Sequence, residues 1–95
     1  MNDYLLLMHD DAVADAAAWA PYFERLRESG RFDGGSAIGP GACVTKSGAQ
    51  RPVTGHLAGY IRVRAESLDA ARALLAGNPV FEAGGTVEIR ALPRG

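Results

Sequence analysis

The stretch GYIRVR, at residues 59–64, is the clearest strand pattern in this chain. Apolar and polar side chains alternate through it, which is typical of a strand with one buried face. Residues 67–76 follow with the apolar spacing of a helix, for which Ser67 is the expected N-cap and Asn78-Pro79 the expected stop. Residues 86–92 alternate again. The second half of the chain therefore predicts a strand, a helix and a strand.

The first half of the chain begins in a similar way. Residues 4–8, YLLLM, are apolar at every position. A strand with one wet face would alternate, so this run predicts a strand that is covered on both faces. The apolar stripe that follows predicts a helix from about Ala20, with Pro21 in its first turn and Gly30 at its end.

The middle of the chain is rich in glycine and is harder to interpret. Gly34-Gly35 and Gly39-Pro40-Gly41 are typical of turns. Residues 36–38 and 42–46 are short strand candidates, or two parts of one bent strand. Residues 50–54 return either as an arm of a hairpin or as a loop.

The order of these elements predicts a ferredoxin-like α+β fold, β-α-β-β-α-β, in one domain over residues 1–95. Right-handed crossovers place both helices on one face of an antiparallel sheet, with the first strand in the middle. The other face of that strand would then be uncovered, although residues 4–8 are apolar on both sides. A second copy of the chain is the simplest cover, so we expect a homodimer formed by sheet-to-sheet packing.

Composition places limits on function. Of the 95 residues, 47% are hydrophobic and 22% are charged, which is ordinary for a globular domain. The formal net charge of −1 provides no attractive field, so we expect neither nucleic-acid binding nor membrane binding. The one cysteine, Cys43, cannot form an internal disulfide, and we expect a buried, inert thiol. No secretory signal pattern stands at the start, and we predict a cytoplasmic protein.

Short motifs are spread over nearly the whole chain, at residues 4–8, Ser29-Gly30, Gly39-Pro40, Val53-Thr54, Gly59-Tyr60 and residues 87–90. Together they resemble the YCII-related family, particularly its DGPF-type branch. Their order and spacing, more than any one of them, make the case. The resemblance implies a dimeric α+β barrel, in which two ferredoxin-like units pack sheet against sheet.

The chain departs from that family at its functional motifs. Val53-Thr54 is followed by Gly55-His56-Leu57 instead of the Asp-Gly-Pro-Phe segment of the DGPF-type branch. The resemblance also places a histidine and aspartate dyad at positions that hold Trp19 and Asn78 here. Tryptophan does not transfer protons and asparagine has no titrating carboxyl group. The acid–base chemistry of the family therefore does not carry over to these two positions.

His9 stands at the predicted end of the central strand and is the candidate catalytic base. Asp11 is better placed than Asp10 to orient its ring, because adjacent residues on a strand point to opposite faces. The alternative is a histidine in a solvated polar cluster with no catalytic role.

Five further side chains are candidates for binding a ligand in a cleft between the helices and the sheet: Trp19, Tyr22, His56, Tyr60 and Asn78. Trp19 and Tyr22 flank the apolar stripe, where they either line a pocket for a flat ligand or pack in the core. His56 lies in a predicted loop that either closes over a cleft or stays on the surface.

The arginines of the predicted strands also have two interpretations. Arg62, Arg64 and Arg90, with Glu88 nearby, either bind an anionic group or form ion pairs between strands. The two histidines and scattered carboxylates lack the close spacing of a metal site, so we predict no metal and no cofactor.

These observations favour a small protein that binds a small organic ligand in a cleft of a dimeric α+β barrel. The alternative is an enzyme that transfers a proton, as in lactone isomerisation or elimination, with His9 as base. RNA binding is disfavoured, because the third predicted strand carries one aromatic residue, Tyr60, where an RNA-recognition sheet stacks several.

Overall fold

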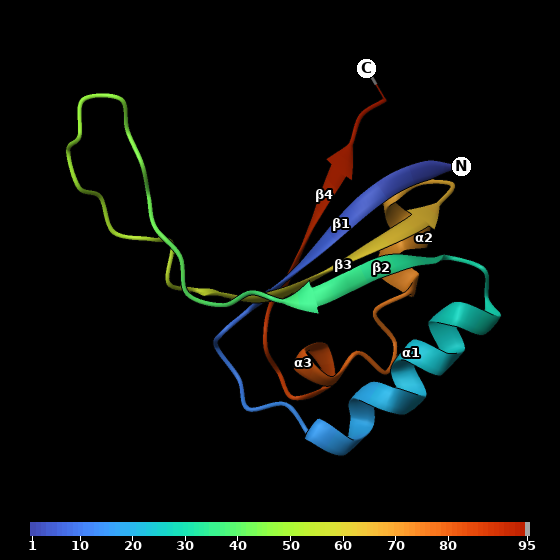
Figure 1. The fold of residues 1–95 in the computed structure, drawn as a ribbon. Coiled ribbons are helices and arrows are strands. Elements are labelled where there is room, and N and C mark those ends of the chain that lie inside the picture. The colour runs from blue at the N-terminus through green and yellow to red at the C-terminus, as the bar shows by residue number, and fades with distance from the viewer. Residues whose placement is uncertain (95) are drawn as a thin grey trace.

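The computed structural model describes residues 1–94 as an antiparallel sheet with helices packed on one of its faces (Figure 1). The strand order is β2-β3-β1-β4, so the first strand lies between β3 and β4. The strands are β1 (Asn2–His9), β2 (Phe32–Ala37), β3 (Leu57–Ala65) and β4 (Val87–Leu92). The helices are the 3-10 turn η1 (Ala16–Ala18), α1 (Trp19–Glu28), α2 (Leu68–Ala73) and α3 (Pro79–Glu82). The predicted ferredoxin-like fold is confirmed.

The core is built on one face of β1. Tyr4, Leu6 and Met8 point toward the helices and are buried. They pack with buried residues of β3 and of the helical layer, which are Ile61, Val63, Ala65, Tyr22, Leu26, Ala71, Leu75 and Val80. Burial of one such large side chain stabilises the fold by about 1.5–3 kcal/mol, so the central strand contributes a large share of the stability.

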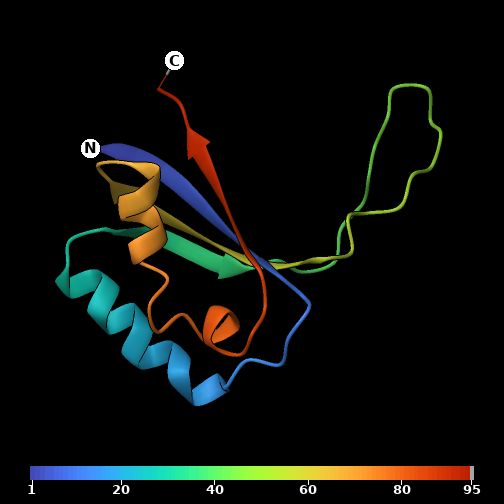
Figure 2. The same cartoon turned by 180° about the vertical axis from the view of Figure 1, so that it is seen from behind.

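Within residues 1–94, the opposite face of the sheet carries no helix, and we call it the open face (Figures 1 and 2). Leu5 and Leu7 of β1 lie on it and are only half-buried. In the β1–β3 and β1–β4 registers, Leu7 lies between Tyr60 and Glu88. The apolar run of the first strand thus has one half in the core and one half on this uncovered surface.

Ion pairs surround part of the open face. Arg62 Nε lies 3.1 Å from Asp33 Oδ2, and Arg62 Nη2 lies 3.6 Å from Asp3 Oδ2. Arg94 Nε lies 3.1 Å from the same Asp3 oxygen. Arg62 therefore forms ion pairs between strands, as one of the two interpretations of the arginines predicted.

The first helix has the bounds and end signals that the sequence predicts. It begins at Trp19, one residue before the predicted start, and Pro21 lies in its first turn. The N–H of Ser29 donates to the carbonyl of Arg25, and the N–H of Gly30, which has a φ of 73°, donates to the carbonyl of Arg27. A glycine is favoured there because a residue with a Cβ is strained in that conformation.

The second helical region contains an element that the sequence analysis missed. Ser67 caps α2 as predicted, its hydroxyl accepting from the N–H of Ala70. Asn78-Pro79 was expected only to stop this helix, but it starts the additional short helix α3. The Asn78 side-chain oxygen accepts from the N–H groups of Val80 and Phe81 at 3.0 and 3.1 Å, and Pro79 occupies the first turn.

The middle segment differs from its prediction in β2. This strand begins at Phe32 and includes Gly34-Gly35, which was expected to be a turn. Gly34 has a φ of 99°, and the pairing of β2 with β3 shifts register between Phe32 and Gly35. The two glycines therefore form an irregularity within a strand, where a φ above zero is needed.

Residues 38–56 form an arm that projects away from the sheet, as both views show (Figures 1 and 2). The predicted strand over residues 42–46 does not form. The two sides of the arm meet at one bridge, between Cys43 and Arg51. Cys43 is exposed, so the prediction of a buried thiol was wrong, because the arm does not pack against the core that would cover it.

The cap of α3 gives the first testable prediction. Asn78 is fully buried, so Asn78→Ala removes two hydrogen bonds and leaves a void beside the core. We expect a loss of about 2 kcal/mol in the free energy of unfolding, measured by urea denaturation. Ser67→Ala, which removes an exposed cap, is the matched control with an expected loss of about 1 kcal/mol. An Asn78→Ala cost at or below that of the control would contradict this account of α3.

Candidate functional site

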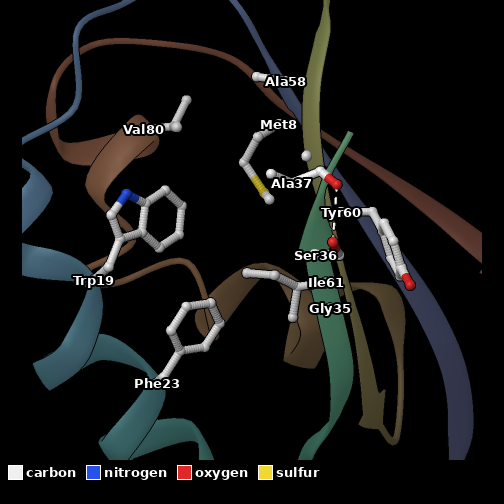
Figure 3. Close-up of a pocket in the computed structure, with 11 residues that line it drawn as sticks. Met8, Trp19, Phe23, Gly35, Ser36, Ala37, Ala58, Tyr60, Ile61 and Val80 are labelled. Atoms are coloured by element: carbon white, nitrogen blue, oxygen red, sulfur yellow. Dashed lines mark hydrogen bonds between the residues drawn. The ribbon is translucent and has the colours of Figure 1, made fainter. Parts of the chain in front are cut away.

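A cavity of about 420 Å³ lies on the helix-covered face, between α1 and the ends of β2 and β3 (Figure 3). Its large lining side chains are apolar: Met8, Trp19, Phe23, Ile61 and Val80. None of the residues that line it carries a charged side chain. A space of this size and character fits a small organic molecule.

The cavity exists because small residues stand where strands β2 and β3 face α1. Gly35, Ala37 and Gly59 all line it, and Ala37 pairs with Gly59 across the two strands. A Cβ on Gly35 would lie 2.6 Å from the backbone oxygen of Tyr60, so the close approach of β2 to β3 also requires glycine there. The volume that larger side chains would fill is left open.

Aromatic rings form the wall that α1 contributes. The rings of Trp19 and Phe23 are stacked, with centroids 5.6 Å apart and an interplanar angle of 22°. The ring of Tyr22 meets the ring of Trp19 edge to face, with centroids 6.4 Å apart. Trp19 and Phe23 are partly buried and pack against the core, which fixes their orientation. Such a wall favours a flat, uncharged ligand over a charged one.

A second group of candidate side chains lies on the open face, at the end of β1. His9 Nε2 lies 3.0 Å from Glu88 Oε1, and Arg90 Nη1 lies 3.1 Å from Glu88 Oε2. The ring of His56 meets the ring of His9 edge to face, with centroids 4.9 Å apart. We call these four residues the His9 cluster.

The alternation of β1 separates this cluster from the cavity. Met8 points into the cavity, so the next residue, His9, points to the open face, where Leu7 also lies. Glu88 pairs with Leu7 across β1 and β4, which brings its carboxylate beside the imidazole. The hydrogen bond from His9, and then that from Arg90, lower the pKa of Glu88 below its usual 4.5. Glu88 was not predicted as a partner because the strand register is invisible in the sequence.

Asp11, the expected partner of His9, has a different role. Its two carboxylate oxygens accept from the N–H and the hydroxyl of Thr86, at 2.9 and 2.6 Å. These hydrogen bonds lower the pKa of Asp11 below its usual 3.8. Asp11 therefore ties the segment after β1 to the residue that precedes β4.

Two of the predicted ligand residues lie in the core. Tyr22 is buried and its hydroxyl donates to the carbonyl of Leu74 at 2.8 Å. Burial raises the pKa of Tyr22 above 10.0, partly offset by the Asn78 side chain and the charge of Arg25. Asn78 is fully buried at the α3 cap, and its Nδ2 has no hydrogen-bond partner within residues 1–94.

The six predicted site residues are thus divided among three places. Trp19 lines the cavity, His9 and His56 meet on the open face, and the other two helix-layer candidates are buried in the core. Tyr60 belongs to the cavity wall through its strand, but its ring points away from the cavity (Figure 3). Their roles in binding stay predictions. The sequence analysis missed Gly35 and Ala37 as cavity residues, and small residues on a strand were the available signal.

A comparison with protein-family models gives a match to the YCII-related domain over residues 3–94. The chain belongs to the YCII-related family. Among solved structures, this YCII-related chain is similar to 5-chloro-2-hydroxyhydroquinone dehydrochlorinase (TftG) from Burkholderia phenoliruptrix AC1100, in complex with 2,5-dihydroxybenzoquinone. The TM-score is 0.60 at 16% identity, over 98% of this chain and 95% of that one, so the likeness concerns the fold. A comparison with curated proteins gave no match.

The YCII-related chain has no helix within residues 1–94 that is long and apolar enough to cross a membrane. Its membership of the family agrees with the resemblance found in the sequence, while Trp19 and Asn78 stand where that resemblance places the dyad. The structure places Trp19 in the wall of an apolar cavity and Asn78 in a helix cap. Packing, rather than proton transfer, accounts for both side chains.

Asp11 gives a prediction about pH. The pKa of Asp11 is lowered in the folded state. The stabilising effect of its carboxylate is therefore fully present above pH 3.8, the usual pKa, and is lost as the pH falls through the lowered pKa. We expect Asp11→Asn to be less stable than wild type near neutral pH, with a difference that shrinks below 3.8. Urea denaturation at about pH 7 and about pH 2.5 measures this.

The control is Asp10→Asn, which changes the exposed neighbour of Asp11. Its difference from wild type should be small and show no comparable change with pH. A destabilisation by Asp11→Asn that stays constant over the same range would mean that the carboxylate of Asp11 does not hold Thr86 as described.

Proposed function

We propose that this YCII-related protein binds a small, flat, uncharged organic ligand in the cavity between α1 and the sheet. The observation that carries the proposal is the cavity of about 420 Å³ with stacked Trp19 and Phe23 rings in its wall. An apolar wall of stacked rings gains from contact with a ring face. It offers no charged partner to an ion, and burying an unpaired charge is costly.

The fold neighbour supports the class of ligand. TftG is a dehydrochlorinase of a chlorinated hydroxyhydroquinone, and its structure holds 2,5-dihydroxybenzoquinone, a flat six-membered ring. Hydroquinone is a simple neutral probe of this class, because it keeps the ring and two hydroxyl groups. The small residues Gly35, Ala37 and Gly59 leave the room that a ring requires.

We further propose that the protein is a homodimer whose open faces pack together. Leu5 and Leu7 form an apolar strip along the middle of that face. Ion pairs of Arg62 with Asp3 and of Arg90 with Glu88 lie on either side. An apolar centre within a charged rim is the usual anatomy of a protein interface. The DGPF-type branch is the subgroup that we propose, on the Val53-Thr54 and Gly59-Tyr60 motifs.

The alternative function is proton transfer with His9 as base, as in lactone isomerisation or elimination. The contact of His9 with the Glu88 carboxylate is the observation that favours it, because a carboxylate stabilises the imidazolium that a base becomes. Its substrate would meet His9 at the open face rather than in the cavity. The test is the isomerisation rate of α-angelica lactone, which His9→Ala should reduce if His9 is the base.

The cavity proposal predicts the effect of filling the cavity. Ala37→Leu places a larger apolar side chain among the lining residues. We expect hydroquinone affinity, measured by isothermal titration calorimetry, to fall by at least about tenfold, or about 1.4 kcal/mol. Ala91→Leu is the matched control, because Ala91 is also an exposed alanine, lies on the other edge strand and faces the same side, opposite Tyr4. Equal affinities in wild type and Ala37→Leu would contradict the proposal.

The dimer proposal predicts a monomer when charge enters the apolar strip. Leu7→Lys places an ammonium beside Glu88, which a monomer tolerates, but a dimer would bury it against the partner sheet. Light scattering after size exclusion should give a dimeric mass for wild type and a monomeric mass for this variant. Leu68→Lys, at a 47% exposed leucine of α2, should remain a dimer. A monomeric wild type at all soluble concentrations would contradict the proposal.

A further inference from the structure

We propose that Glu88 is the positioning residue of His9, and that it leaves Nδ1 of His9 as the basic nitrogen of a proton-transfer site on the open face. This inference rests on the alternative function above and names the group, the atom and the side of the sheet that it would use. The sequence had offered Asp11 or Asp10 for this role.

The hydrogen bond selects one form of the imidazole. Glu88 Oε1 lies 3.0 Å from His9 Nε2, and a carboxylate only accepts hydrogen bonds, so Nε2 carries the proton. A neutral imidazole has one N–H, so its other nitrogen, Nδ1, holds a free lone pair. Within residues 1–94, no protein group bonds to Nδ1, and the His9 side chain keeps 21% of its surface exposed.

The carboxylate that selects this form is itself held in place. Arg90 Nη1 donates to Glu88 Oε2 at 3.1 Å, so each carboxylate oxygen has its own partner. The lowered pKa of Glu88 keeps the carboxylate ionised at neutral pH and agrees with this geometry. Neither aspartate competes, because Thr86 occupies both oxygens of Asp11 and Asp10 is exposed.

A neutral imidazole with this orientation can move one proton without a co-reactant. In a β,γ-unsaturated lactone, the C–H bond between the carbonyl and the double bond breaks, and its proton forms an N–H bond at His9 Nδ1. The electron pair moves into the conjugated carbonyl as a dienolate, and the imidazolium is stabilised by the Glu88 carboxylate. The proton then returns to the far carbon, so the double bond shifts and the base is regenerated.

The chemistry defines the substrate class as a small carbonyl compound with an acidic C–H next to the carbonyl. His56 lies against the imidazole, with its ring 4.9 Å away, and limits the approach from that side. The site is thus separate from the apolar cavity, which opens on the other face of the sheet. A binding ligand in the cavity and a substrate at His9 need not be the same molecule.

The test is the tautomer of His9, read from the ¹⁵N shifts of its ring in nitrogen-labelled protein at a pH where the ring is neutral. We expect a proton on Nε2 in wild type and in Glu88→Gln, which keeps an acceptor oxygen, and a mixed population in Glu88→Ala. Glu24→Ala, which removes an exposed glutamate of α1, is the control. A wild-type proton on Nδ1, or no change in Glu88→Ala, would overturn the inference.

Turnover of α-angelica lactone separates this inference from the function on which it rests. We expect His9→Ala to reduce the isomerisation rate by about a hundredfold or more. Glu88→Ala should reduce kcat by about tenfold or more with little change in KM, and Glu88→Gln should restore part of it. Turnover insensitive to His9→Ala would remove the proton-transfer function, whatever the tautomer. A fixed tautomer with a full rate in Glu88→Ala would remove the positioning role alone.

Discussion

The structure depends on one constraint, which is that β1 is apolar on both faces and pairs with a strand on each side. Its even-numbered residues, such as Leu6, supply the centre of the core, and its odd-numbered residues, such as Leu7, face outward. Because β3 and β4 both pair with it, their registers are fixed by this strand. The helices of residues 1–94 cover one face, and the apolar side chains of β1 on the other face remain half-buried.

The same strand divides the functional chemistry into two places. Met8 and His9 are neighbours in sequence, yet one belongs to an apolar cavity and the other to a cluster of ionisable groups. The cavity has aromatic walls and no charge, which suits binding, whereas the His9 cluster has a base, a carboxylate and an arginine, which suits proton transfer. The two faces of the sheet therefore keep the apolar cavity and the ionisable cluster apart, with no charged side chain among the cavity-lining residues.

Local patterns predicted the fold well, because they report burial and helix ends directly. The alternation in β3, the Ser67 cap and the Gly30 end all lie where the sequence indicated. The site was harder to predict, because it depends on pairings between distant segments. Glu88 meets His9 only through the register of β4 on β1, and the cavity arises from the absence of side chains at Gly35 and Gly59. Small residues on a strand can be read from the sequence, but the pairing that brings them together beside one helix cannot.

The central claim is that the hollow between α1 and the β2–β3 edge is the ligand site. Backbone amide shifts of labelled protein during a hydroquinone titration test it most directly, since they report position as well as binding. The account predicts saturable changes at Gly35, Ala37 and Gly59 and at the indole N–H of Trp19, the chain's one tryptophan. Shifts confined to the arm or the open face, or no shifts at all, would contradict it.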